Sequence, residues 1–112
     1  MLTRHSTAGT KLRIEIPYIP KYLNPMQRDC VYFARALHDK LHDGENYQVC
    51  AHNVLHYKGV FIDAKGIHTG EELRRRYGCE PRPDRDGWNY IYDLELLKTY
   101  RKIMKKVVVE EE

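Results

Sequence analysis

The sequence has few cysteines, no long apolar run and no strong excess of charge of either sign. Its three cysteines, Cys30, Cys50 and Cys79, are an odd number at wide spacings without a CxxC pair. This pattern argues against a disulfide framework and against a structural zinc ribbon, so we expect reduced thiols. No apolar run is long enough to cross a bilayer and no leader opens the chain, so we expect no membrane association and a cytoplasmic location.

The small net charge bears on whether the protein binds nucleic acid. A formal charge of +3 over 112 residues does not indicate nucleic-acid binding without a concentrated patch. Two local candidates for such a patch are Arg74-Arg75-Arg76 and residues 98–106. The length suits one domain with a single core. No motif indicates a cofactor, and the sequence leaves the oligomeric state open.

The hydrophobic pattern predicts one α+β domain over residues 11–107, between flexible tails at residues 1–10 and 108–112. Alternation of apolar and polar residues predicts strands at 11–16, 47–57, 60–65 and 88–92, and three-and-four spacing predicts helices at 25–41, 70–77 and 94–107. Thr69 and Glu72 form a capping-box pattern for the middle helix. We expect a helix that carries Cys30 on a small antiparallel sheet, with a C-terminal amphipathic helix covering an edge or face.

The hairpin expected at residues 47–66 brings fold and chemistry together. Lys58-Gly59 suits a two-residue turn, which sets Leu55 opposite Ile62. Because side chains alternate with period two, His52 and Asp63 then share one face as diagonal neighbours. The register alone therefore brings an imidazole and a carboxylate within reach.

Cys30 follows Asp29 at the start of a predicted helix, where unpaired backbone N–H groups stabilise a thiolate. Together with His52 and Asp63 it supplies the three parts of nucleophilic catalysis. Cys30 is the candidate nucleophile, His52 the general base and acid, and Asp63 the group that orients the imidazole. His56 lies on the same face and replaces His52 if the register slips by two residues.

These residues resemble the papain-like cysteine hydrolases, in particular small bacterial members such as the NlpC-type cell-wall peptidases and related amidases. The resemblance covers residues 25–66 and rests on Asp29-Cys30 opening an apolar helix, VYFARAL, followed by His52 and Asp63 on later strands. It implies a papain-like core and hydrolysis or transfer at an amide, isopeptide or thioester carbonyl of a peptide or protein. The implied oxyanion hole uses the N–H of Cys30 and the side chain of Gln27.

Three alternatives stay open. Cys30 lies on the apolar stripe of its helix and is equally explained as a core thiol. Cys50, His52 and His56 alternate on one strand and point the same way, as metal ligands would, although a fourth ligand would have to come from elsewhere. A binding or inhibitor module, of the kind that phages also encode, would use the basic C-terminal helix to engage a protein or nucleic acid without catalysis.

Overall fold

The computed structural model describes residues 2–6 and 12–111, and these residues form an α+β fold. They contain three α-helices and two antiparallel sheets, of five and three strands. The coarse prediction of helices packed on a small antiparallel sheet is confirmed. None of the helices in this part of the chain has the length and apolar character that crossing a bilayer requires.

The larger sheet carries the candidate residues His52 and Asp63. Its strands stand in the order β6-β5-β4-β3-β7. At the turn between β4 and β5, Lys58 has φ 49° and Gly59 has φ 82°, and Leu55 pairs with Ile62 as predicted. The strands are β3 (Glu45–Val49), β4 (His52–Tyr57), β5 (Val60–Asp63), β6 (Gly66–His68) and β7 (Arg82–Pro83).

The strand expected at residues 47–57 is in fact two strands. A tight turn at Cys50 and Ala51 separates β3 from β4, and Val49 pairs with His52 across it. Cys50 adopts φ 54°, a conformation that favours a turn. The alternation of side chains gives no sign of this turn because it contains neither glycine nor proline. The turn makes His52 the first residue of β4.

Both expected tails are wrong where the structure describes them. Residues Leu2–Ser6 form β1 and Val108–Glu111 form β8, and both pair antiparallel with the central strand β2 (Leu12–Pro17). Ile14 in β2 is fully buried, so this strand needs partners on both sides for its backbone groups. Residues 1, 7–11 and 112 lie outside the described residues. The predicted strand at 11–16 is otherwise confirmed.

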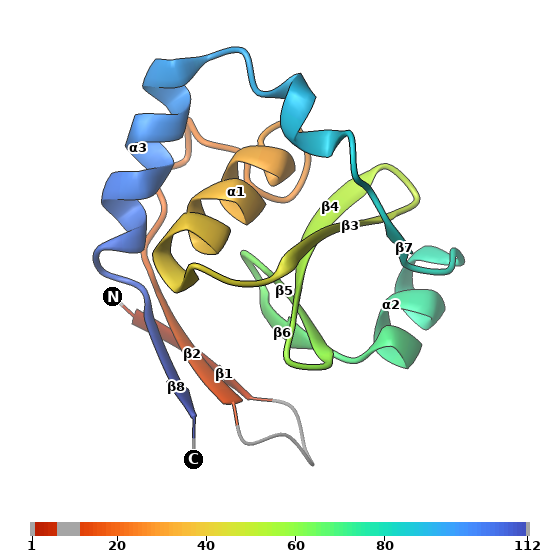
Figure 1. Ribbon diagram of the computed structural model, residues 1–112. Coiled ribbons are helices and arrows are strands. Elements are labelled where there is room, and N and C mark those ends of the chain that lie inside the picture. The colour runs from red at the N-terminus through yellow and green to blue at the C-terminus, as the bar shows by residue number, and fades with distance from the viewer. Residues whose placement is uncertain (1, 7–11, 112) are drawn as a thin grey trace.

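The three helices are α1 (Cys30–Leu41), α2 (Gly70–Tyr77) and α3 (Leu94–Met104). Figure 1 shows α1 between α3 and the five-stranded sheet, with α2 beside that sheet at some distance from the other helices. The capping box of Thr69 and Glu72 opens α2 as predicted, and Gly78 with φ 72° closes it. Asp93 caps α3 by accepting a hydrogen bond from the N–H of Leu96.

Helix α1 begins later than Asn24-Pro25 predicted. The carboxylate of Asp29 accepts the N–H of Asn24 at 2.9 Å, and the N–H of Asp29 donates to the Asn24 carbonyl at 2.8 Å. These two bonds close the segment into turns before the helix. The consequence is that Cys30, expected one turn inside the helix, is its first residue.

The segment 88–92 is not the strand that its aromatic alternation predicted. Residues Gly87–Tyr90 form a 3₁₀ helix, η1, and the preceding loop contributes β7 at the sheet edge. Trp88 packs against His38 and lies under the guanidinium of Arg35. The indole therefore contacts α1 rather than a neighbouring strand.

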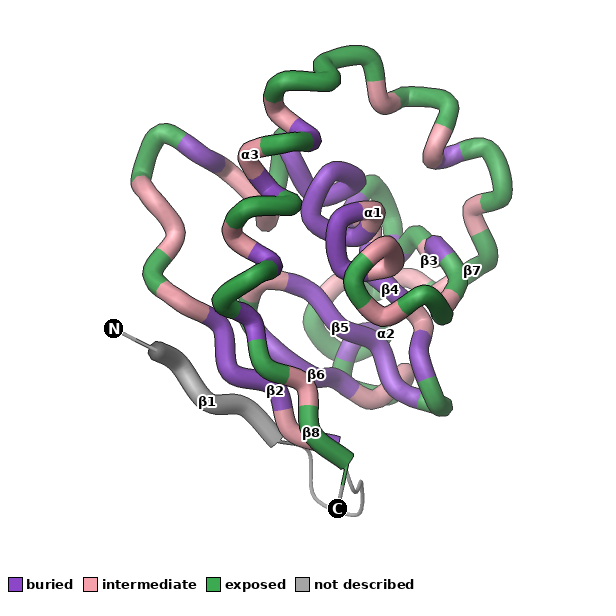
Figure 2. Tube along the Cα trace, turned by 60° about the vertical axis from the view of Figure 1, so that its left-hand side comes forward, coloured by how far each residue is buried: buried purple, intermediate pink, exposed green. Residues whose placement is uncertain are grey.

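The two faces of the larger sheet are both covered. On one face Leu55 and Ile62 pack with Leu37 of α1 and Tyr100 of α3 in the main core. On the other, a smaller cluster contains Val49, Val54, Phe61 and Leu73 of α2. Figure 2 shows buried residues running through α1 and the central strands, with exposed residues mostly in the outer turns and loops. The face that carries His52 and Asp63 is therefore covered at these two residues as well.

Candidate active site

His52 and Asp63 form a buried pair at neighbouring strand ends. His52 begins β4 and Asp63 ends β5, and His52 Nε2 lies 2.9 Å from Asp63 Oδ2. His52 is 6 % exposed and Asp63 is 1 % exposed, so little water competes for the bond. The diagonal pairing that the register predicted is the arrangement that the structure has.

Asp63 has a second histidine partner. His68 Nε2 lies 2.9 Å from Asp63 Oδ1, which also accepts the N–H of Lys65 at 2.8 Å. Burial raises the pKa of Asp63, but the hydrogen bonds from the two histidines outweigh it and hold the pKa well below its usual range. Asp63 is therefore a carboxylate that accepts a bond from each of two buried imidazoles.

Sequence reasoning missed the contact between His68 and Asp63. In the register of β5 and β6, Phe61 pairs with His68 and Asp63 pairs with Gly66. His68 is thus a diagonal neighbour of Asp63, in the same relation that singled out His52. A two-residue turn at Ala64 and Lys65, had it been predicted, would have placed His68 on the sheet face that carries His52 and Asp63.

The thiol of Cys30 is held by Asn53, the second residue of β4. The N–H of Asn53 donates to Sγ at 3.3 Å, and Sγ lies 3.6 Å from the Asn53 side-chain oxygen. Cys30 is 5 % exposed. A backbone N–H aimed at a largely buried sulfur stabilises negative charge on it. Cys30 therefore differs from an ordinary core thiol, because the backbone N–H and the side-chain oxygen of Asn53 contact its sulfur.

The pKa of His52 is raised by Asp63 and, to a smaller extent, by Cys30. Burial lowers the pKa of His52, but its contacts with Asp63 and then with Cys30 outweigh burial and raise the pKa from 6.5 to about 9. No aligned hydrogen bond joins the two side chains: His52 Nδ1 is buried and has no hydrogen-bond partner in the described part of the chain. The structure thus brings Cys30, His52 and Asp63 together, with one imidazole nitrogen left free.

A disulfide lies beside His52, which corrects the expectation of three reduced thiols. Cys50, in the turn before β4, is bonded to Cys79, which follows the C-cap of α2. The ring of Tyr77, at the end of α2, stacks on the ring of His52 with centroids 5.5 Å apart. The disulfide joins the turn before His52 to the helix end that covers it. The residues are far apart in sequence, so spacing could not reveal the bond, and Cys30 is the free cysteine.

The remaining sequence candidates lie elsewhere. His56 packs between Tyr47 and Phe61, with ring centroids 4.6 Å from each, so its ring is engaged by aromatic neighbours. Gln27 is exposed, and its side-chain oxygen accepts from Asn24 at 3.4 Å. The N–H of Cys30 points at the Gln27 carbonyl oxygen at 3.4 Å, a weak hydrogen bond. The expected oxyanion role of Gln27 therefore has no support from its hydrogen bonds.

The metal alternative loses its first ligand, because Cys50 is held in the disulfide. Over residues 2–6 and 12–111, no group of three or more His, Cys, Asp or Glu side chains is arranged to hold a metal ion.

A polar network leads from Cys30 towards an open pocket. The side-chain amide of Asn53 donates to Asn46 Oδ1 at 3.2 Å and to Asp84 Oδ2 at 2.9 Å, and Asn46 donates to the Asp84 carbonyl. Asn46 and Asp84 also line a pocket of about 390 Å³. Asn53 therefore contacts the thiol on one side and the pocket wall on the other. The full lining is Gly44, Glu45, Asn46, Pro83, Asp84, Arg85 and Trp88.

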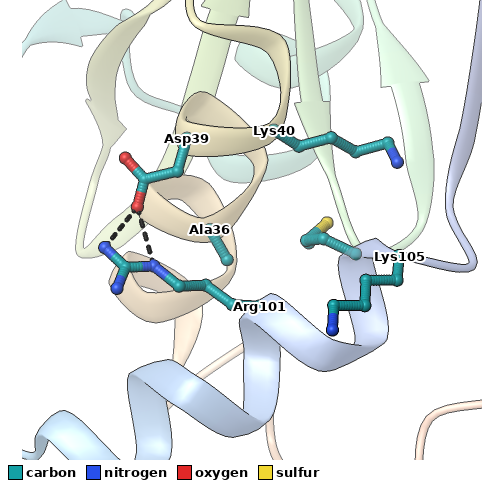
Figure 3. A pocket seen from close by; sticks show the side chains of 6 residues that line it. Ala36, Asp39, Lys40, Arg101 and Lys105 are labelled. Atoms are coloured by element: carbon teal, nitrogen blue, oxygen red, sulfur yellow. Dashed lines mark hydrogen bonds and ion pairs between the residues drawn. The ribbon is translucent and has the colours of Figure 1, made fainter.

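A second pocket, of about 260 Å³, lies between α1 and α3 at the far end of α1 from Cys30. Figure 3 shows Asp39 bound by Arg101 on one side of it and the side chains of Lys40 and Lys105 on the other. Ala36 and Met104 complete the lining. This pocket is basic and has no contact with the Cys30 site.

Comparison with known proteins adds no relative: no family model matches the chain, and no curated protein or solved structure matches it. The functional argument therefore depends on the site itself.

Proposed function

We propose that this protein is a small cysteine hydrolase or transferase that acts on an amide, isopeptide or thioester carbonyl through Cys30, His52 and Asp63. One observation carries the proposal: His52, whose Nε2 is held by Asp63 and whose buried Nδ1 has no hydrogen-bond partner among the described residues, directly precedes Asn53, whose N–H donates to Cys30 Sγ. A core thiol would not need an oriented imidazole with one nitrogen left free.

The proposed chemistry uses the form in which the thiol proton of Cys30 has moved to His52 Nδ1, so that a thiolate lies beside an imidazolium, the ring state that the raised pKa of His52 favours. The thiolate then attacks the substrate carbonyl carbon and forms a tetrahedral intermediate. As that intermediate collapses, the bond to the leaving amine or thiol breaks, and the leaving group takes the proton from His52. The product of this step is a thioester between the acyl group and Cys30.

A second nucleophile completes the reaction. Water, or an amine in a transferase, gives its proton to His52 Nδ1 as it attacks the thioester, and the Cys30 thiolate is released and reprotonated. Asp63 accepts from Nε2 throughout and so leaves Nδ1 available for the proton of the thiol. The N–H of Cys30 at the start of α1 is the nearest candidate for the oxyanion, because its bond to Gln27 is weak.

The order of the three residues along the elements supports a papain-like enzyme as part of the proposal. Cys30 opens a helix, His52 opens a strand packed against that helix, and Asp63 lies on the next strand. The open, polar pocket next to Asn53 suits a peptide or protein segment better than a small apolar molecule.

The first test is the pH dependence of Cys30 alkylation by iodoacetamide. Because Cys50 and Cys79 are bonded, intact mass reports labelling of Cys30 alone under non-reducing conditions. We expect rapid labelling near pH 6.5, well below the ordinary thiol pKa of about 8.5. His52→Gln should abolish it, and His56→Gln, the same change on the same strand, should not. Labelling that starts only when urea unfolds the chain would overturn the proposal.

The second test distinguishes the substrate classes. Incubation with a peptide thioester, a peptide anilide and an isopeptide should add the acyl mass to Cys30 with at least one of them, and not to Cys30→Ser. Asp63→Asn should slow acylation without abolishing it, because the nucleophile and base remain. If the native protein labels rapidly but none of the three substrates acylates it or is turned over, the thiol is reactive without being a hydrolase.

A non-catalytic binding role has one observation in its favour. The α1–α3 pocket is bordered by Lys40 and Lys105, and Lys102 and Lys106 extend the exposed positive surface at the end of α3. These lysines also have a purely structural explanation, because cations at the C-terminus of a helix complement its dipole. The double variant Lys40→Glu and Lys105→Glu should bind an acidic partner or nucleic acid more weakly, and its binding should depend less on salt concentration. Cys30 alkylation should be unchanged.

A further inference from the structure

Both carboxylate oxygens of Asp63 accept hydrogen bonds. Oδ2 is 2.9 Å from His52 Nε2, and Oδ1 is 2.9 Å from His68 Nε2 and 2.8 Å from the N–H of Lys65. His68 is 8 % exposed and Asp63 is 1 % exposed. The mechanism proposed above uses His52 and Asp63 but leaves this second buried histidine without a role.

The hydrogen bonds settle where the ring protons are. An ionised carboxylate only accepts, so each histidine must carry a proton on the Nε2 that faces Asp63. For neutral His52 this leaves Nδ1 unprotonated, which is the state a general base requires. The same argument makes His68 a donor to Oδ1.

The backbone holds His68 rigidly in this position. It ends β6, where it pairs with Phe61, and it directly precedes Thr69, the N-cap of α2. Both the strand register and the capping box therefore restrain the residue.

We infer that His68 is a positioning residue for the proposed Cys30 site: its Nε2–H holds Asp63 Oδ1 so that Oδ2 fixes the Nε2–H tautomer and ring orientation of His52. The inference rests on the proposed function. Without His68, Oδ1 keeps only the N–H of Lys65, so the orientation of the carboxylate is restrained by one hydrogen bond fewer. His52 then loses part of the preference that keeps Nδ1 free beside the sulfur.

The experiment compares His68→Gln, whose amide N–H can take the place of Nε2–H, with His68→Leu, which has no donor. His56→Leu on β4 is the matched control for loss of an imidazole. Two quantities are measured in each folded variant: the alkylation rate of Cys30 at pH 7, and the ring ¹⁵N chemical shifts of His52 well above pH 9, where the ring is neutral and its shifts report the tautomer.

We expect His68→Leu to lower the alkylation rate about 10-fold, the scale of one hydrogen bond to a charged group. Its His52 ¹⁵N shifts should move towards a mixture of tautomers. His68→Gln should restore the rate to within about 2-fold, on the same scale, and keep the Nε2–H form. His56→Leu should change neither quantity.

The inference is overturned if folded His68→Leu keeps the native rate and the native His52 shifts, or if Gln and Leu lower the rate equally. The His52→Gln variant separates this failure from failure of the proposed function. Loss of labelling in His52→Gln with native labelling in His68→Leu would remove the role of His68 and leave the Cys30 and His52 pair intact. Native labelling in His52→Gln would remove both.

Discussion

The raised pKa of His52 makes the stability of this protein depend on pH in a defined window. The imidazole has a pKa of about 9 in the folded chain and 6.5 as the reference for the unfolded chain. Because the folded state binds this proton more tightly, the contribution to stability is fully present below about pH 6.5 and is lost as the pH rises through about 9.

The size of the effect follows from that difference. At about 1.36 kcal/mol per pH unit, the rise from 6.5 to about 9 corresponds to about 3 kcal/mol in the free energy of unfolding. His52 is 6 % exposed, so solvent screens its bond to Asp63 little. Asp63 raises the pKa of His52 more than Cys30 does. In Asp63→Asn, most of the fall in the free energy of unfolding with rising pH, about 2 kcal/mol, should therefore disappear.

The assay is urea unfolding of the native protein and Asp63→Asn at pH 6.5 and pH 9, under non-reducing conditions. The native protein should lose more stability between the two pH values than the variant does. Asp39→Asn is the control: it also removes one carboxylate, but Asp39 binds Arg35 and Arg101, which stay charged over this range. An equal loss in the native protein and in Asp63→Asn would refute the link between Asp63 and His52.

Three further predictions concern the surroundings of the site. Cys79→Ser, which opens the bond to Cys50 over a separation of 29 residues, should lower the free energy of unfolding by about 3 kcal/mol in urea, and native stability would refute the bond. Gly87→Ala should lower the free energy of unfolding by about 1–3 kcal/mol and slow Cys30 alkylation, because the new Cβ would stand 2.0 Å from Asn46 Nδ2, which belongs to the hydrogen-bond network of Asn53. An unchanged alkylation rate would show that this network does not affect the thiol. Asp29→Asn should lower the free energy of unfolding by roughly 2–4 kcal/mol at pH 7, since this buried carboxylate accepts hydrogen bonds from three residues, Asn24, Arg28 and Tyr100. The difference from the native protein should shrink in acid as the native carboxylate protonates.

The sequence by itself determined the features whose causes are local. Lys58-Gly59 specified the β4–β5 turn, and period-two alternation then placed His52 and Asp63 on one face. Thr69 and Glu72 closed a capping box within a single turn of helix. In each case the interacting groups are joined by a short stretch of chain whose geometry leaves few arrangements.

Only the tertiary structure decided which distant groups meet. Nothing near Cys30 in the chain indicates that Asn53 would hold its sulfur, or that Cys50 and Cys79 would be joined. The same holds for β1 and β8, which pair with β2 because a buried strand needs partners for its backbone groups, whatever the sequence of the tails looks like alone. These contacts depend on how helices and sheets pack over the whole core, so residue spacing carries no record of them.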